Sequence, residues 1–300
     1  MVKLPMDADI LPPSDDRIFK TLLTHPDAKQ VLIDVVSTVI NQKVTDVQVR
    51  GIEAPVMDTE EKSERFDVNC TVDSGDQVDV EMHSCRQDEI GSEHTNFIKK
   101  YVYFLSDLHS SQKSKGIKYR DLVRTYHVTF SMYTVLPSLP DYVNWFSLRT
   151  GKGIQLTDQI NMIIVELSKL NDILKKPVEE LTSFEKWSLF FRYAQEPLQR
   201  NLINDIIKKK EEIGMAAALL QEISQDENER AHLRSRKMYE MDRVSDLLTA
   251  EERGEIRGRA EGEARGITKG RAEGKAEGKA EIIALLEKGL TLEEIKKQLK

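Results

Sequence analysis

The sequence has no long apolar run and only two cysteines, and each scarcity excludes a class of protein. No stretch approaches the ~18 consecutive apolar residues of a membrane-spanning helix, so we expect no membrane partner. Cys70 and Cys85 cannot build a disulfide framework, and this predicts a reducing, cytoplasmic compartment. The first ten residues hold two acids and no apolar core, which does not match a secretion signal.

An excess of basic residues is missing as well. The 44 Lys and Arg residues stand against 51 Asp and Glu residues, so the net charge of −7 gives no overall attraction to nucleic acid. DNA binding would therefore need a local basic patch. From Lys99 to Arg124, seven basic residues stand against two acidic ones, although a solvated helix face would explain the same pattern. The candidate DNA-binding residues are Lys99, Lys100, Lys113, Lys115, Lys118 and Arg120.

The character of the sequence changes along the chain and predicts three regions. Residues 12–175 alternate helical runs with strand-like runs, which indicates an α+β core with a mixed sheet flanked by helices. Residues 176–250 have a helical pattern throughout, and residues 251–300 form a charged tail that ends in a short helix pair. The strands are expected at residues 44–52, 65–72, 77–83, 125–132 and 162–167.

The strongest local pattern is a strand hairpin. Both arms carry apolar residues at even positions and polar residues at odd positions, which is typical of a half-buried sheet. Paired residues in a hairpin face the same way, so the apolar residues share a face only if the numbers of paired residues sum to an even value. A three-residue loop at Ser74–Asp76 gives such a register. This register predicts Asp67 opposite His83 and Asn69 opposite Glu81.

The polar face of this hairpin could bind a metal ion. Paired or diagonal residues in a hairpin lie ~4.5–8 Å apart at Cβ, so Asp67, Glu81 and His83 would converge on one face. Two carboxylates at that separation can share a hard divalent cation, which can polarise a phosphodiester and activate water. The alternative is that these residues form only the solvated face of the sheet.

The hairpin and its neighbours resemble the PD-(D/E)XK nuclease superfamily, and in particular its recombination-promoting nuclease / putative transposase family. The resemblance covers nearly the whole chain in order. The matching segments are Asp16–Leu23, Lys62–Val68, Val80–His83, Asn96–Tyr101, Ser111–Gln112 with Gly116 and Tyr119, and the Glu/Gly/Arg-rich tail.

This resemblance implies a restriction-endonuclease-like fold and a DNA endonuclease that uses Mg²⁺ or Mn²⁺ in recombination or transposition. It implies that Asp67 and Glu81 bind the metal. His83 stands where the family usually has Gln and the superfamily usually has Lys. Asp16 matches an acid near the site, although a helix-start residue placed favourably in the helix dipole explains it equally well. Two alternatives are a catalytically inactive DNA-binding relative and an interaction protein that acts through its tail.

The tail carries a glycine at every fourth position from Gly254 to Gly278. Each glycine costs roughly 0.8–1 kcal/mol in a helix relative to alanine, so an isolated helix here would be weak. The regular stripe nevertheless allows two helices to approach closely, which predicts a homo-oligomer formed through the tail. The alternative is a flexible charged spacer.

Overall fold

The computed structural model describes residues 2–50, 68–84, 95–112, 118–289 and 291–298. The chain divides into two compact units, Met1–Leu233 and Arg234–Lys300. We describe each unit by itself. Among the described residues, no helix is both long and apolar enough to cross a membrane.

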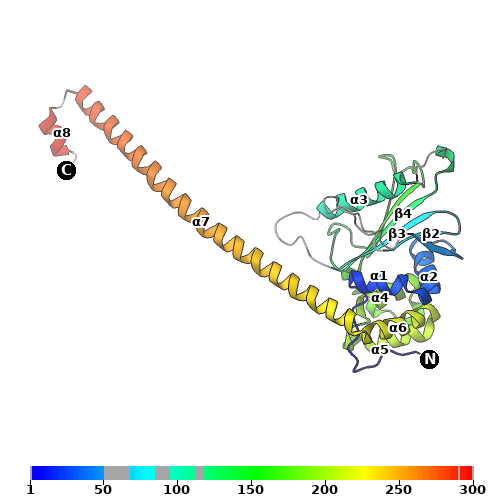
Figure 1. The fold of residues 1–300 in the computed structure, drawn as a ribbon. Coiled ribbons are helices and arrows are strands. Elements are labelled where there is room, and N and C mark those ends of the chain that lie inside the picture. The colour runs from blue at the N-terminus through cyan, green and yellow to red at the C-terminus, as the bar shows by residue number, and fades with distance from the viewer. Residues whose placement is uncertain (1, 51–67, 85–94, 113–117, 290, 299–300) are drawn as a thin grey trace, which may run out of the picture. The chain divides into compact units, whose positions relative to one another are not determined.

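The first unit is built on a six-stranded sheet with the strand order β1-β2-β3-β4-β6-β5 (Figure 1). The β3–β4 and β4–β6 pairs are parallel and the other pairs are antiparallel. This arrangement confirms the predicted mixed sheet of an α+β fold. The strands are β1 (Val47–Val49), β2 (Val68–Val72), β3 (Gln77–His83), β4 (Thr125–Ser131), β5 (Val143–Ser147) and β6 (Ile160–Glu166).

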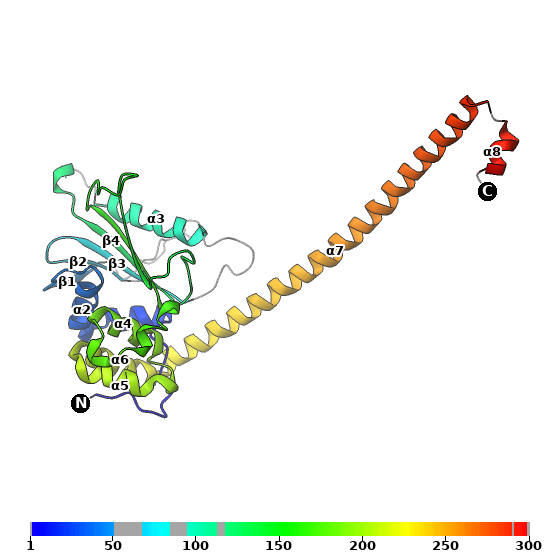
Figure 2. The same ribbon diagram turned by 180° about the vertical axis from the view of Figure 1, so that it is seen from behind.

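Helices cover both faces of the sheet, as the two opposite views in Figures 1 and 2 show. Helix α3 (Thr95–Ser110) lies over one face by itself. On the other side lie α1 (Asp16–Thr24), α2 (Lys29–Val39), α4 (Ser183–Tyr193), α5 (Arg200–Lys209) and α6 (Glu211–Gln225).

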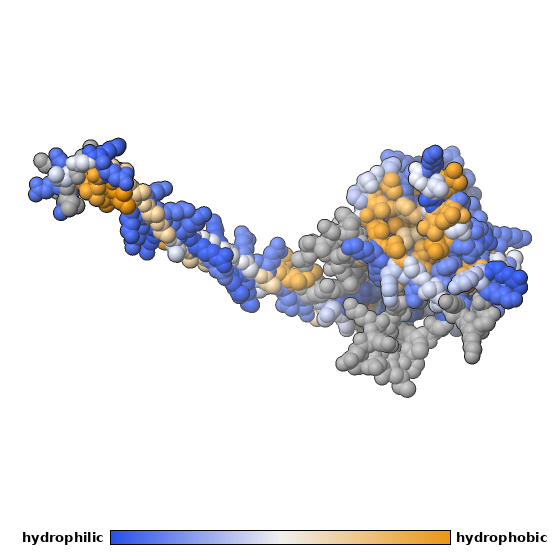
Figure 3. Space-filling model, turned by 90° about the horizontal axis from the view of Figure 1, so that it is seen from above, coloured by the Kyte–Doolittle hydropathy of each residue, from blue (hydrophilic) through white to orange (hydrophobic). Residues whose placement is uncertain are grey.

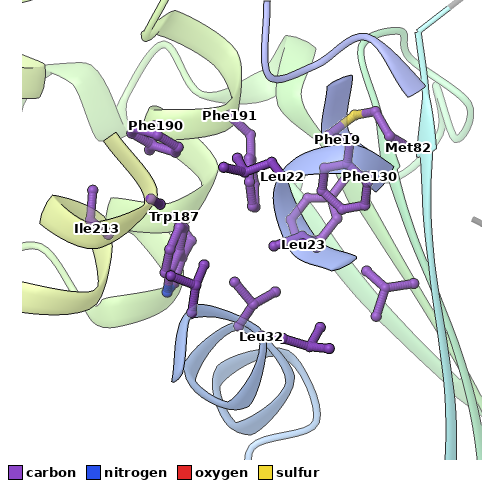
Figure 4. Packing of buried hydrophobic residues seen from close by; sticks show 14 of the residues in the cluster. Phe19, Leu22, Leu23, Leu32, Met82, Phe130, Trp187, Phe190, Phe191 and Ile213 are labelled. Carbon is purple, nitrogen blue, oxygen red and sulfur yellow. The ribbon is translucent and has the colours of Figure 1, made fainter. Parts of the chain in front are cut away.

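The larger hydrophobic core lies between the sheet and α1, α2, α4 and α6 (Figure 4). The rings of Phe19 and Phe130 each pack edge-on against Phe191, with centroids 5.1 and 5.2 Å apart. Trp187 stacks on Phe191 at 5.4 Å. The helices after the sheet therefore share one core with it. The boundaries between regions that the sequence predicts at residues 175 and 250 stay predictions.

The β2–β3 hairpin has the predicted separation of faces but a different register. Asn69 pairs with Asp79, not with Glu81, so the predicted register is wrong by two residues. The three-residue loop begins one residue earlier and ends at Gly75, whose φ is +88° and whose N–H donates to Val72 O at 2.8 Å. In such loops a turn is followed by the positive-φ residue, so glycine belongs in the last loop position and not in the middle.

Strand β5 is an edge strand that was not predicted from the sequence. Its residues are half-buried or exposed, and Trp145 and Phe146 are successive exposed aromatics. Without one buried face, the strand lacks the alternation that identifies β2, β3 and β4.

The second unit consists of most of α7 (Glu227–Glu287) together with α8 (Leu292–Gln298). Its helix surface is mainly hydrophilic (Figure 3). The glycines from Gly254 to Gly278 lie inside α7, and a Cβ added at any of them would meet nothing within 4 Å. Among the described residues of this chain, nothing packs against the glycine stripe.

Candidate metal centre

The polar face of β3 and β4 lies beneath α3. The two strands are parallel and pair Asp79 with His127, Glu81 with Thr129, and His83 with Ser131. Successive residues of a strand point to opposite faces, so these odd-numbered polar residues share the face opposite the large core. Helix α3 buries most of them, and the exposed fractions of Asp79, Glu81 and His127 are 0%, 5% and 0%.

Asp79, Glu81 and His127 together form a candidate metal centre. Each offers one ligand atom, and these atoms all lie within 4.8 Å of one another. The closest printed contact joins His127 Nδ1 to Asp79 Oδ2 at 2.8 Å. Carboxylate oxygens suit a hard ion such as Mg²⁺, and the added imidazole nitrogen is compatible with Mn²⁺. Two buried carboxylates so close together are costly, and a cation would offset that cost, so this donor set fits a divalent metal.

A set of hydrogen bonds connects this centre to His83. His127 Nε2 lies 3.1 Å from Thr129 Oγ1, and Thr129 is also hydrogen-bonded to Tyr101. The Tyr101 hydroxyl lies 2.8 Å from His83 Nδ1. Burial, and then the charge of Glu81, raise the pKa of Tyr101 well above its ordinary value, so its hydroxyl keeps its proton.

Helix α3 also brings a cation to the centre. Lys100 Nζ lies 3.9 Å from Glu81 Oε2 and 4.9 Å from the centroid of the Phe104 ring. About half of the Lys100 side chain is exposed, so it can be reached from solvent. A residue predicted from the sequence to contact DNA therefore contacts an acid of the candidate centre.

The structure brings together only some of the residues predicted for the site. Glu81 and His83 lie on the same face of β3, as expected. Asp67 lies outside the described residues, so its role stays a prediction. Asp16 is in the first turn of α1, where its carboxylate accepts a hydrogen bond from Arg17 N at 2.8 Å. That position matches the helix-start interpretation, and a role for Asp16 in the site stays a prediction.

The predicted DNA-binding residues are only partly described. Lys99, Lys118 and Arg120 are exposed, and Arg120 pairs with Asp121 at 3.6 Å. Lys113 and Lys115 lie outside the described residues. Contact of this group with DNA stays a prediction.

His127, Thr129, Tyr101 and Asp79 were not predicted from the sequence as site residues. One signal was available, because residues 125–131 alternate polar odd positions with apolar even positions, as the hairpin does. That alternation could have placed His127 and Thr129 on a polar face. It could not have shown that β4 lies beside β3.

One comparison with known proteins gives a match. The model of the family described as PD-(D/E)XK nuclease family transposase matches residues 13–250. This range includes the whole sheet and α1 to α6, and it ends inside α7 before the first glycine of the repeat. No curated protein and no solved structure gives a significant match.

Proposed function

The chain belongs to the family of PD-(D/E)XK nuclease family transposases, and we propose that it is a metal-dependent DNA endonuclease acting in recombination or transposition. The observation that carries this proposal is the buried group of Asp79, Glu81 and His127 beneath α3. Two buried carboxylates with oxygens within 4.8 Å of each other are expensive and are often kept for function. Glu81 is also the acid of the Glu-x-His segment that carries the resemblance.

Mg²⁺, or Mn²⁺, is the proposed cofactor. Glu81 is the proposed ligand in the described part of the chain, with Asp79 and His127 close enough to contribute, and Asp67 is proposed from the resemblance. When bound, such an ion lowers the pKa of water and offsets negative charge that develops on a phosphodiester. The chemistry of two or three oxygen donors with one nitrogen donor favours Mn²⁺ at least as much as Mg²⁺.

The remaining side chains bind and orient the substrate. Lys100, next to Glu81, can contact a phosphate oxygen while it holds the carboxylate. The His83 ring packs on Phe97 with centroids 4.1 Å apart, which fixes the plane of the imidazole. We assign His83 the role of orienting the attacking water, and we assign Lys99, Lys118 and Arg120 contacts with the DNA backbone.

Cleavage of supercoiled plasmid tests this function. The purified chain should nick plasmid in Mg²⁺ or Mn²⁺ and not in excess chelator, and Glu81→Gln should remove the activity. Glu185→Gln is a matched control, because Glu185 is also a buried acid but belongs to a capping box on α4. Glutamine is accepted at that capping position, so this variant should cut at the parental rate.

Two other outcomes correspond to different functions. If neither metal supports cutting but the protein binds DNA with steep salt dependence, the chain is an inactive DNA-binding relative. If the protein neither cuts nor binds DNA, the proposed function is wrong and an interaction role of the tail is favoured.

A further inference from the structure

The outer edge of β5 has no partner strand in the described part of the chain. β5 is the last strand in the sheet order, and it pairs with β6 on its inner side. The extended run continues past the end of β5, because Arg149 forms an antiparallel bridge with Gln155. Residues 143–149 therefore form one open edge of the sheet.

The backbone of this open edge offers a regular row of hydrogen-bonding groups. Glu166 N donates to Tyr142 O at 2.7 Å, and Leu156 N donates to Leu148 O at 2.9 Å, so the even-numbered residues of this run bond inward. In an antiparallel pair, such residues alternate with residues whose N–H and C=O groups point away from the neighbouring strand. The N–H and C=O groups of residues 143, 145, 147 and 149 therefore point outward, where they can pair with another strand.

The open edge lacks the features that usually keep an edge strand from pairing. Proteins protect such edges with short strands, prolines or charged side chains. The run from the start of β5 to Leu148 includes no proline and no charged residue, and it exposes Trp145 at 46%, Phe146 at 38% and Leu148 at 45%. Phe146 pairs with Met162 on the α3 side of the sheet, whereas Trp145 contacts Tyr126 on the side of the large core. Apolar surface is therefore exposed on both faces of this edge.

We propose that this edge pairs with the same edge of a second copy of the chain, in antiparallel orientation about a two-fold axis at Phe146. In this register, residue 143 of one copy lies opposite residue 149 of the other, and residue 145 lies opposite residue 147. Every outward N–H and C=O group of the run is then hydrogen-bonded. The Phe146 rings of the two copies lie opposite each other, and aromatic pairs of this kind stabilise neighbouring strands.

Charge favours a second copy in this orientation. The two copies carry a net charge of −7 each, and they meet along a run that has no charged residue between Tyr142 and Leu148. Arg149 of one copy lies opposite Val143 of the other, and therefore diagonal to Asp141 of that copy, within reach of a long side chain. By symmetry the same contact forms twice. A parallel arrangement would instead place Arg149 beside Arg149 and Asp141 beside Asp141.

The pairing places both candidate metal centres on one face of a continuous sheet. Asp79, His127, Met162 and Phe146 form one row across β3, β4, β6 and β5. A two-fold axis perpendicular to the sheet keeps the α3 faces of both copies on the same side. Neighbouring strands lie ~4.8 Å apart, so the two centres are roughly 25–35 Å apart. Action of the pair on both strands of one DNA duplex rests on the proposed function, whereas the pairing of the edges does not.

Cysteine cross-linking of the full-length chain tests the register. The background is Cys85→Ser, and the remaining Cys70 is buried. Phe146→Cys places two thiols opposite each other at a position without inter-strand hydrogen bonds, where Cα atoms lie ~4.5 Å apart and a disulfide can form. Mild oxidation of this variant should convert most of it to a covalent dimer on a non-reducing gel.

Two cysteine variants are matched controls. Asn144→Cys lies on the same strand and the same face, but the proposed register separates its two copies by ~13 Å along the strands, so it should not cross-link. Leu198→Cys replaces a side chain that is 94% exposed, and it should not cross-link either. If the tails alone held the chains together, Phe146→Cys and Asn144→Cys would cross-link to the same extent.

Ser147→Pro tests the hydrogen bonds of the edge. The Ser147 N–H points outward, so proline removes no hydrogen bond to β6 and is tolerated at such positions of edge strands. Added to Phe146→Cys, this substitution should reduce the yield of covalent dimer to that of Asn144→Cys and should leave the circular dichroism spectrum unchanged.

The proposal is overturned if Phe146→Cys gives no more covalent dimer than Asn144→Cys, or if Ser147→Pro folds and leaves the yield unchanged. Neither result depends on cleavage of DNA. A chain that cuts DNA without this cross-link refutes only the pairing, and a chain that cross-links but cuts nothing refutes only the proposed function.

Discussion

Replacing Glu81 with glutamine should abolish cleavage and, at the same time, stabilise the metal-free protein. Glu81 is buried beside Asp79, with carboxylate oxygens of the two residues within 4.8 Å. Glutamine keeps the shape and removes the charge. Loss of cleavage and gain of stability have one cause. Two carboxylates close together can bind a cation, but without a cation their charges repel each other.

The magnitude follows from the geometry. The oxygens of the two carboxylates lie within 4.8 Å of each other, and two unit charges at that limit repel by about 3 kcal/mol at an effective dielectric constant of ~20. The variant also loses the attraction between Glu81 and Lys100, which is half exposed and 3.9 Å away, and such contacts are worth ~0.2–1 kcal/mol. A net gain of roughly 2 kcal/mol is expected, which corresponds to about 4–8 °C in the midpoint of thermal unfolding.

Thermal and urea unfolding, with and without Mn²⁺, measure this trade-off. In chelator, Glu81→Gln should unfold at a higher temperature than the parent. At a metal concentration about one hundred times the Kd, the parent should gain ~2.7 kcal/mol, whereas the variant should gain little. When metal is added, the unfolding temperature of the parent should therefore equal or exceed that of Glu81→Gln.

The control is Glu185→Gln, which removes a buried acid that Lys176 already neutralises at 2.5 Å. It should be destabilised or unchanged in chelator and should keep the parental response to metal. If Glu81→Gln is less stable than the parent in chelator, the reasoning about unfavourable crowding is wrong. If its response to metal equals that of the parent, Glu81 is not a ligand.

Three further outcomes are expected. Lys100→Ala should lower the rate of plasmid cleavage at every salt concentration, because it removes the ammonium group next to the Glu81 carboxylate. Lys99→Ala should mainly weaken DNA binding and reduce the salt dependence of that binding, which a binding titration would show. The hydrogen-bonded ion pair with Arg17 lowers the pKa of Glu229 in the folded protein. The ion pair should therefore add about 0.5–1 kcal/mol to the free energy of unfolding above the unfolded-state pKa of ~4.3, and this contribution should be lost as the pH falls below that value. A double-mutant cycle at two pH values measures this, and equal coupling at both would contradict it. Removal of residues 251–300 should leave a folded chain with a lower association state in light scattering, whereas an unchanged state would favour a spacer.

The sequence alone determined which residues share a face. Alternation in residues 77–83 placed Glu81 and His83 together and set them apart from Val80 and Met82, because successive side chains of a strand point in opposite directions. The existence of the sheet strands β2, β3, β4 and β6 and of the helix between β3 and β4 followed from the same periodicities. Which residues share a face is a local property of each strand. An error in register that shifts the pairing by an even number of residues leaves it unchanged.

Turn geometry decided the register of the hairpin. Two three-residue loops keep the apolar residues together, and they differ only in whether Gly75 is the middle or the last loop residue. The backbone of Gly75, at φ +88°, selects the second. As a result Asp79, and not Glu81, lies opposite Asn69 of β2.

The tertiary structure alone decided the composition of the candidate centre. His127 is 48 residues from Asp79 in the chain, and the two meet only because the connection through α3 returns β4 parallel to β3. Tyr101 reaches the same place because α3 packs over the polar face of the sheet. Pairing between distant elements depends on how the whole core packs, whereas periodicity reports only on the surroundings of each segment. A sequence can therefore show that a strand has a polar face without showing which residues of other elements lie next to that face.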